Sequence, residues 1–330
     1  METLLGNEVL EIYVQFIRTA EVNSPNTAKN YEVRIKEFFN IVFGKGVEEV
    51  TKSELKKLKQ VNVSTYANIL IAKGNSKGTV ITKLRSVKSF FKQLSINGVV
   101  SYDLDVFKPN MKSDEKHHDS LYNMEEVEGL YNFILENRKN FPLEQYLFVK
   151  SLFVTANRKS AMMNLEWSNI VKKFDYKTGK SVWVVEVLDK GSKIIEKPIA
   201  DEFYEELLQL KEVDKVFPNI TDDIIRGTMN AYTKHLNDGR NITVHSIKAS
   251  ALTIAYKLTK DIMKVKQLGS HADISTTQIY IRDDESYTEQ LSYKLNSNID
   301  TDKIKELSHE ELLNIIMNNE DLKYSVALKL

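Results

Sequence analysis

The sequence predicts a mainly helical protein with a small antiparallel β-sheet, divided into two domains. Apolar residues recur at helical spacing through about the first 100 residues. Residues 108–120 then form a polar, charged run with little apolar periodicity, as expected of an interdomain linker. Further on, residues 181–189 and 193–200 are dense in Val and Ile and are joined by a short turn, a pattern typical of a β-hairpin. A chain of 330 residues has room for two domains.

The first domain, which we place at residues 1–112, is predicted to hold four or five helices. Ser24 is a favourable N-cap followed by Pro25 at a tolerated first position, and Thr51 with Glu54 has the spacing of a capping box. The expected helices cover residues 5–20, 24–43, 51–58, 63–74 and 77–98. In the last of them, one apolar stripe is formed by Val80, Leu84, Val87 and Phe91.

Basic residues gather in this domain, although the 46 basic and 46 acidic residues of the whole chain balance. Between Thr51 and Lys92, ten Lys and Arg residues are opposed only by Glu54, a local balance of +9. A local basic face can bind phosphates while the whole molecule stays neutral, and the alternative is a solvated helix face. The candidate DNA-binding residues are Lys73, Lys77, Lys83, Arg85 and Lys88.

The second domain is predicted at residues 121–300, after a linker at 113–120 and before a C-terminal helix within 301–330. Helices are expected at 123–138, 143–156, 246–259, 261–270 and 308–322. The last begins at Ser308, with Glu311 in the capping-box position. His117 and His118 lie side by side in the linker without partner ligands, so we expect a solvated pair rather than a metal site.

Composition excludes several classes of function. The chain has no cysteine, which removes disulfides, thiolate metal sites and cysteine nucleophiles. No segment reaches the roughly 18 apolar residues that a membrane helix needs. The N-terminal stretch carries acidic residues and lacks a basic region ahead of its apolar residues, so we do not expect a signal peptide. The composition fits an intracellular protein.

Four stretches of the second domain carry residues suited to chemistry. They are "VTANRKSAMMNLEWSNI" with Arg158, "VLDKGSKIIEKPI" with Lys190, "VHSIKAS" with His245 and Lys248, and "LGSHADISTTQIY" with His271 and Tyr280. Together they resemble the motifs of the tyrosine recombinase family, which includes phage integrases and Xer recombinases. The order of the four stretches and the spacings of 26 residues from His245 to His271 and 32 from Lys248 to Tyr280 suit that family. The resemblance covers about residues 150–285 well and the helical N-terminal part more loosely.

The resemblance implies that Tyr280 cleaves a DNA strand by attacking phosphorus, which leaves a 3′-phosphotyrosine. Arg158 would stabilise the charge on the non-bridging oxygens, and Lys248 stands where the family has a second arginine. His245 and His271 would supply further hydrogen bonds, and either could move the tyrosine proton. The departing 5′-oxygen would take its proton from the hairpin lysine, Lys190. Such chemistry needs no metal and no cofactor.

Two of these assignments leave alternatives open. Lys193 competes with Lys190 for the acid role, and Lys190 is preferred because it precedes the glycine of the turn. Tyr287 and Tyr293 compete with Tyr280, but they lack the upstream histidine and the "STTQ" context.

Three positions depart from the family pattern. Lys248 replaces an arginine, so the positive charge remains while the bidentate geometry is lost. Ala161 stands where an acidic residue is often found, three residues after the first arginine. Ser270 takes the place of the glycine that usually precedes the histidine. The loss of one aligned donor often lowers a rate by about 10²–10³-fold, so slow catalysis is one expectation.

The resemblance also implies an assembly. The two domains would form a C-shaped clamp on duplex DNA, and four subunits would hold two recombination sites, with the final helix docked on a neighbouring subunit. We expect a cytoplasmic, nucleoid-associated enzyme with no small-molecule substrate and no membrane contact. The alternatives are a DNA-binding relative that has lost catalysis, which would form no covalent adduct, and a structural helical protein, whose binding would lack a steep salt dependence.

Overall fold

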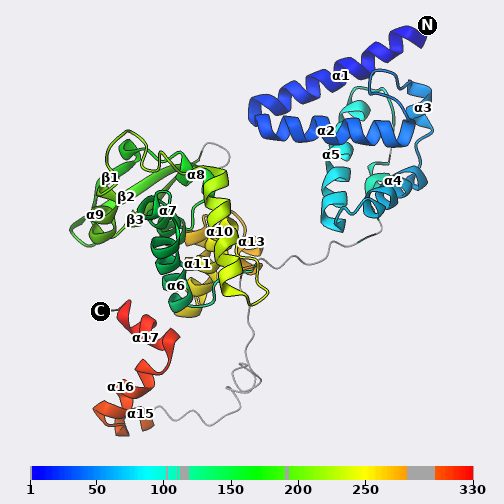
Figure 1. Cartoon of the computed structure of the whole chain (residues 1–330). Coiled ribbons are helices and arrows are strands. Elements are labelled where there is room, and N and C mark those ends of the chain that lie inside the picture. The colour runs from blue at the N-terminus through cyan, green and yellow to red at the C-terminus, as the bar shows by residue number, and fades with distance from the viewer. Residues whose placement is uncertain are drawn as a thin grey trace. The chain divides into compact units, whose positions relative to one another are not determined.

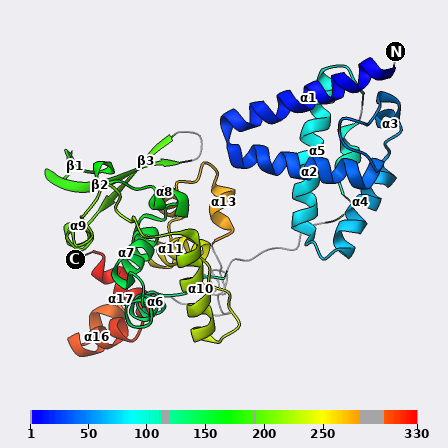
Figure 2. The ribbon, with the colours of Figure 1, turned by 45° about the horizontal axis from the view of Figure 1, so that its top comes forward.

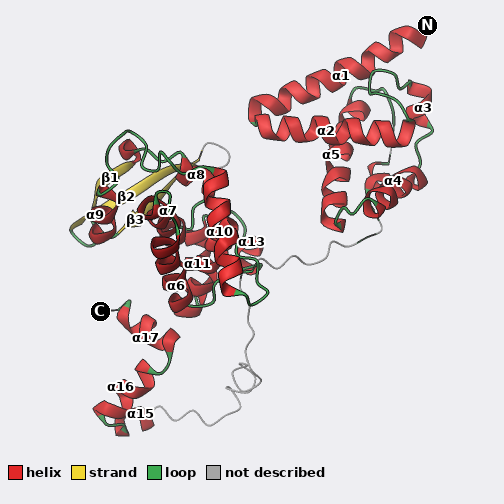
Figure 3. Ribbon diagram, in the orientation of Figure 1, coloured by secondary structure: helices red, strands yellow, loops and turns green. Residues whose placement is uncertain are grey.

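Helices carry most of the chain, and the strands described belong to a single small sheet (Figures 1 and 3). The computed structural model describes residues 2–101, 103–109, 111, 119–189, 193–280 and 302–329. The backbone divides into an N-terminal unit, Met1–Lys116, and a C-terminal unit, His117–Leu330. The predicted fold class, mainly helical with a small antiparallel sheet, is confirmed. Within the described ranges, no helix has the length and apolarity needed to cross a membrane.

The N-terminal unit packs its helices around a core rich in aromatic rings. Its elements are α1 (Glu2–Asn23), α2 (Pro25–Phe43), α3 (Lys52–Lys56), α4 (Gln60–Ala72), α5 (Lys77–Ile96) and the 3-10 helix η1 (Leu104–Phe107). Phe38 of α2 lies at the centre, with ring centroids 5.0 Å from Tyr66 and 5.9 Å from Phe91. Ser24 caps α2, and Thr51 with Glu54 forms the expected capping box.

Helix α5 has the predicted apolar stripe. Val80, Leu84, Val87 and Phe91 are each 0% exposed, because this side of the helix faces the core. The basic residues of the unit divide into two groups. The ammonium of Lys83 lies 2.9 Å from Glu37, and that of Lys88 lies 3.3 Å from Asp105. The other three candidates, Lys73, Lys77 and Arg85, are exposed.

The C-terminal unit combines a three-stranded sheet with helices. Its elements are α6 (Met124–Asn137), α7 (Pro142–Thr155), α8 (Lys159–Met163), η2 (Trp167–Asn169), β1 (Ile170–Asp175), β2 (Lys180–Asp189), β3 (Lys193–Ile199), α9 (Asp201–Leu208), α10 (Asp222–Leu236), α11 (Val244–Thr259), α12 (Ile262–Gly269), α13 (Ile274–Gln278), α15 (Lys303–Glu306), α16 (His309–Met317) and α17 (Glu320–Ala327). The strands are antiparallel in the order β1-β2-β3, with Val184 paired to Val171 and Pro198.

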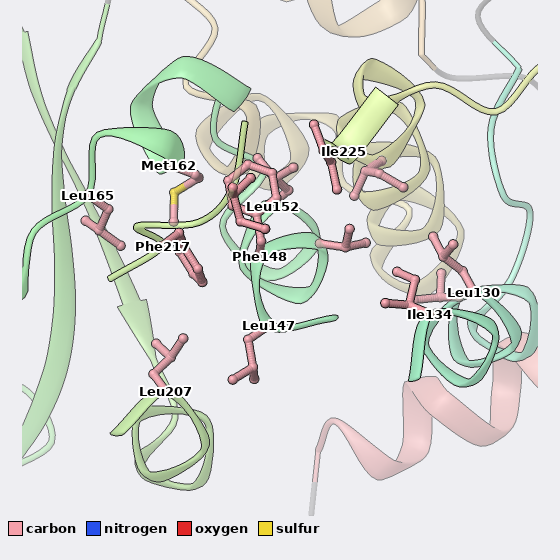
Figure 4. Packing of buried hydrophobic residues seen from close by; sticks show 14 of the residues in the cluster. Leu130, Ile134, Leu147, Phe148, Leu152, Met162, Leu165, Leu207, Phe217 and Ile225 are labelled. Carbon is pink, nitrogen blue, oxygen red and sulfur yellow. The ribbon is translucent and has the colours of Figure 1, made fainter. Parts of the chain in front are cut away.

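Buried residues of α7 organise the core of this unit, as Figure 4 shows. Leu147, Phe148 and Leu152 project from α7 toward different neighbours, and Phe148 meets Phe217 edge to face at 5.2 Å. The core extends to α6, α8, α9 and α10 and to the inner side of the sheet. Because most residues of α7 are buried, its end is a firm starting point for the loop that carries Arg158.

Several elements differ from the sequence-based expectation. Strand β1 and helices α9 and α10 were not predicted, although Thr221 caps α10 and two aspartates occupy its first turn. The single helix expected at 308–322 is wrong: the chain turns at Asn318 and Asn319, where Asn319 caps the separate helix α17. Helix α17 packs on its own unit, with the Ser325 hydroxyl donating to the Leu258 carbonyl at 2.9 Å. Docking of this segment on a neighbouring subunit stays a prediction.

Candidate active site

In the C-terminal unit, helices α8, α10, α11 and α13 lie close to one another (Figure 2). Residues from these helices and the adjoining loops line a cleft of about 670 Å³. Five of the residues predicted to carry the chemistry line it: Arg158, His245, Lys248, His271 and Tyr280. They come from separate stretches of the sequence, so the fold alone gathers them. The cleft is also lined by polar residues of the α10 region, among them Asn230 and Asn241.

Tyr280 is held at its backbone and paired at its hydroxyl. Asp273 caps the short helix α13 by accepting from the Ser275 amide at 2.9 Å. Just after that helix, the Tyr280 carbonyl accepts a hydrogen bond from the Thr253 hydroxyl at 2.7 Å. The phenol is 8% exposed, and its oxygen lies 3.2 Å from Nε2 of His245. The tyrosine is therefore fixed at both ends.

The surroundings of Tyr280 favour its neutral form. Burial raises the pKa of the phenol, and the positive charge of Arg158 opposes that effect without cancelling it. A neutral phenol is a weak nucleophile, so attack requires a base that takes the proton as the new bond forms. His245 stands at hydrogen-bond distance for that purpose.

Helix starts present Arg158 and His245 to the cleft. Ala156 ends α7 in a left-handed conformation (φ 47°), and Arg158 follows as the residue that precedes α8. His245 lies in the first turn of α11, whose start is fixed by a capping box between Thr243 and Ser246. Both side chains are exposed, as a site that receives a large substrate needs.

Lys248 lies one turn further along α11 and is 7% exposed. Its ammonium donates to the carbonyl of Gly269 at 2.8 Å. Burial, helped by the positive charges of Arg158 and Lys197, lowers the pKa of Lys248 to about 8. The position at which the family pattern has an arginine thus holds a buried lysine whose pKa lies closer to neutral pH than that of a solvated lysine.

His271 stacks on Tyr280. Its ring centroid lies 5.6 Å from that of Tyr280, with 19° between the planes, and its Nδ1 lies 3.0 Å from the Thr277 hydroxyl. Burial, then the charges of Lys248, Arg158 and Lys197, lowers the pKa of His271 to about 4. The imidazole is therefore neutral at pH 7.

The remaining predicted residues fall elsewhere. Lys190 lies outside the described residues, as do the competing tyrosines Tyr287 and Tyr293. Ala161 does not line the cleft; its methyl group packs against the core of the unit. Ser270 adopts a left-handed conformation (φ 54°), which is the conformation that a glycine favours. The candidate DNA-binding residues, four lysines and one arginine, belong to the N-terminal unit.

Lys197 of β3 was missed by the sequence analysis. Its side chain is 6% exposed, and its ammonium donates to the carbonyls of Gln267, at 3.0 Å, and Leu268. The alternation of side chains along a strand could have predicted its burial, because Lys197 shares a strand face with Ile195 and Ile199. A lysine at a core-facing strand position marks a buried cation. Within the described ranges, no three His, Asp or Glu side chains gather as a metal site would require.

The fold and the cleft define a class of protein. A family model described as the phage integrase family matches residues 122–286, half of the chain, and the N-terminal SAM-like domain of phage integrases matches residues 10–98. The chain belongs to the phage integrase family and is by class a tyrosine-type site-specific recombinase.

Particular relatives refine this placement. The chain is 29% identical over 303 residues to the SPbeta prophage-derived probable integrase/recombinase YopP of Bacillus subtilis (strain 168), covering 89% of this chain and 83% of that protein. It is 25% identical over 296 residues to tyrosine recombinase XerD of Halalkalibacterium halodurans, covering 85% and 94%.

Two solved structures share the fold of the chain. The XerH site-specific recombinase bound to its palindromic difH substrate aligns with a TM-score of 0.61 and 16% identity, over 77% of this chain and 75% of XerH. A lambda integrase tetramer bound to a Holliday junction aligns with a TM-score of 0.61 and 15% identity, over 80% and 77%.

Proposed function

We propose that this protein cleaves and rejoins duplex DNA at a specific site through a 3′-phosphotyrosine formed on Tyr280. The observation that carries the proposal is the pairing of the Tyr280 hydroxyl with His245 at 3.2 Å, inside a cleft that also presents Arg158, Lys248 and His271. A nucleophile, a base and several groups that stabilise anionic charge are thereby within one site.

In the cleavage step, the Tyr280 oxygen forms a bond to phosphorus while the bond from phosphorus to the 5′-oxygen breaks. His245 takes the phenol proton. The departing 5′-oxygen takes a proton, whose donor we assign to Lys190. Because the phosphodiester is exchanged for a phosphotyrosine ester, rejoining is the reverse attack by a 5′-hydroxyl and needs no external energy source.

The charge that develops on the non-bridging oxygens meets three different donors. Arg158 offers a planar fork, which suits two oxygens at once. Lys248 offers a single point charge. His271 is neutral, and the Thr277 hydroxyl can donate to its Nδ1, which leaves Nε2 to carry the proton toward a phosphate oxygen. Preorganised donors of this kind supply the main stabilisation in such a step.

The DNA partner and the assembly belong to the same proposal. We assign residues 1–112 to a DNA-binding domain, 113–120 to a linker and 121–300 to the catalytic domain, which together clamp the duplex in a C shape. Dimers and then a tetramer on two sites are supported by the solved relatives, which include a recombinase on its substrate and an integrase tetramer on a Holliday junction. The protein would act at the nucleoid, in the cytoplasm.

The C-terminal segment 301–330 is proposed to dock on a neighbouring subunit within that tetramer. Helix α16 exposes several large apolar residues that the described part of the chain does not cover: Leu312, Leu313, Ile315 and Met317. An apolar face of this kind suits a protein contact better than water.

The test is covalent capture. The protein is incubated with a library of nicked duplexes that carry a randomised segment, and adducts are selected under denaturing conditions. We expect a sequence-dependent adduct with the natural chain and none with Tyr280→Phe, which should still bind DNA. Tyr204→Phe is the matched control, because Tyr204 stacks on Trp183 outside the cleft. An adduct that persists in Tyr280→Phe would exclude this nucleophile.

A DNA-binding relative without catalysis is the second candidate. The observation that favours it is Lys248, whose buried ammonium is bound to the Gly269 carbonyl. Specific binding of a selected duplex without any adduct would support this candidate over the recombinase.

A further inference from the structure

Lys197 is a cation in the interior of the C-terminal unit. It occupies the core-facing side of β3, between Ile195 and Ile199, and is 6% exposed. The partners that the described part of the chain gives its ammonium are the carbonyls of Gln267 and Leu268 rather than a carboxylate. Burial lowers the pKa of Lys197 to about 8. A buried charge is costly to fold, so a lysine at this position calls for an explanation.

The same helix end receives a second lysine. Lys248 of α11 donates to Gly269 at 2.8 Å, so the last three carbonyls of α12 are bound by ammonium groups from two different elements. The carboxyl end of a helix carries unsatisfied carbonyls and a partial negative charge, which cations stabilise. We call this arrangement of Lys197, Lys248 and residues 267–269 the lysine clamp.

The two residues that follow the lysine clamp, Ser270 and His271, connect it to Tyr280. Ser270 turns the chain back in a left-handed conformation (φ 54°), and His271 then lies against the helix end. A Cβ atom added to Gly269 would lie 2.8 Å from Cε1 of His271, so the two are in close contact. His271 in turn stacks on Tyr280. Any shift of the helix end therefore moves the His271 ring.

We propose that Lys197 is a positioning residue for strand cleavage: together with Lys248 it holds the carboxyl end of α12 and thereby fixes His271 against Tyr280. This inference rests on the proposed function. Lys197 does not line the cleft of Tyr280; it lines a neighbouring cavity of about 730 Å³ between β3 and α12. It acts through the helix end and through its charge, not by contact with the scissile phosphate.

Charged residues from several elements surround His271. They include Lys197 and Glu196 of β3, Lys248 of α11, Arg158 before α8, Lys264 and Lys266 of α12, and Asp273 before α13. The charge of Lys197 contributes to the lowered pKa of His271, after burial, Lys248 and Arg158. Removal of that charge is therefore expected to raise the pKa of His271.

The test measures the pKa of His271 by NMR titration of its ring in the DNA-free protein. In Lys197→Met we expect this pKa to rise, and in Lys197→Arg to stay near its natural value. The matched control is Lys257→Met, because Lys257 also donates to a carbonyl, that of Tyr122 at 3.1 Å. An unchanged His271 pKa in Lys197→Met would overturn the proposal.

Covalent capture separates this inference from the proposed function. If the protein forms adducts, Lys197→Met should form them about tenfold more slowly or worse at unchanged DNA affinity, and an unaltered rate would count against a positioning role. If no duplex yields an adduct while the His271 pKa still shifts, the recombinase proposal fails and the lysine clamp stands as a structural feature.

If Lys197→Met is too unstable to study, the proposal can be tested in the natural protein. Lysines labelled at Cε in the natural protein can be titrated directly. We expect two of them to titrate near pH 8, the pKa given to Lys197 and Lys248 by their burial. Titration of every lysine near the usual value of about 10.4 would show that the clamp is not buried and would overturn the proposal.

Discussion

Lys248 is the residue at which this chain departs most from its family pattern. An arginine there could keep one donor on the Gly269 carbonyl and aim others at the non-bridging oxygens. We predict that Lys248→Arg speeds single-turnover cleavage of a nicked substrate, by up to ~10²-fold, the scale of one oxyanion donor. A slower variant would mean that the buried pocket is adapted to lysine. Failure of both proteins on the selected site would favour the DNA-binding candidate.

Ser270 carries a backbone strain that its family position normally avoids. A left-handed conformation costs an L-residue roughly 1–2 kcal/mol, and glycine is free of that cost but loses more conformational entropy on folding. We predict that Ser270→Gly raises the free energy of unfolding by about 0.5–1 kcal/mol, as measured by denaturant titration. The control is Ser325→Gly, which removes a helical serine from α17 and should lower stability. A destabilised Ser270→Gly would show that the serine side chain itself matters.

His271 makes stability depend on pH. Its pKa is about 4 in the folded protein, below the value of about 6.5 in an unfolded chain, so the unfolded state binds more protons between these values. Stability from this residue is complete above pH 6.5 and falls as the pH drops through 4. We predict that the natural protein loses more stability than His271→Gln when the pH is lowered through this range. Parallel curves for the two proteins would contradict a buried, neutral His271.

At the scale of elements, the sequence predicted correctly the features that depend only on the local spacing of residues. The α5 stripe, the capping boxes and the hairpin strands follow from residue spacing alone. Helix α10 was not predicted, because Gly227 and several β-branched or polar residues weaken its local helix propensity. In the folded protein, packing of Ile225 and Met229 stabilises it. The burial of Lys197 was not predicted, because a lysine in a strand is normally solvated. Its burial depends on the position of α12, which lies far away in the sequence.

The candidate site shows the same division. Motif spacing singled out Arg158, His245, Lys248, His271 and Tyr280, and the fold brings these five side chains to one cleft. What spacing could not supply was geometry: which histidine pairs with the phenol, and which stacks on it. Those relations depend on how α11, α12 and α13 pack, since the two histidines come from different elements.

Basic residues of α4 and α5 should differ in their use. Lys83 and Lys88 are engaged with Glu37 and Asp105, whereas Lys73 and Arg85 are exposed. We predict that changing Lys73 and Arg85 to Gln lowers the slope of log K against log salt by roughly one for each DNA phosphate that is no longer neutralised. Changing the ion-paired lysines should alter the slope less. Equal slopes for all variants would place this face away from DNA.

At the scale of the whole molecule, each unit has a hydrophobic core of its own. The N-terminal unit has its own aromatic core, and the C-terminal unit has a core organised on α7. A site that depends on ångström-scale alignment benefits from a scaffold packed independently of the DNA-binding face. We propose that the N-terminal unit supplies affinity for DNA, that the C-terminal unit supplies the chemistry, and that the C-terminal segment supplies contacts between subunits.

The central claim is that Tyr280 becomes covalently linked to DNA. The most direct measurement is peptide mass spectrometry of the captured adduct, after nuclease digestion leaves a short nucleotide on the attached residue. We predict that the nucleotide mass is found on the peptide that contains Tyr280, joined through a 3′-phosphate. A nucleotide on a peptide that contains Tyr287 or Tyr293 instead, or the absence of any modified peptide from a specifically bound duplex, would contradict the account.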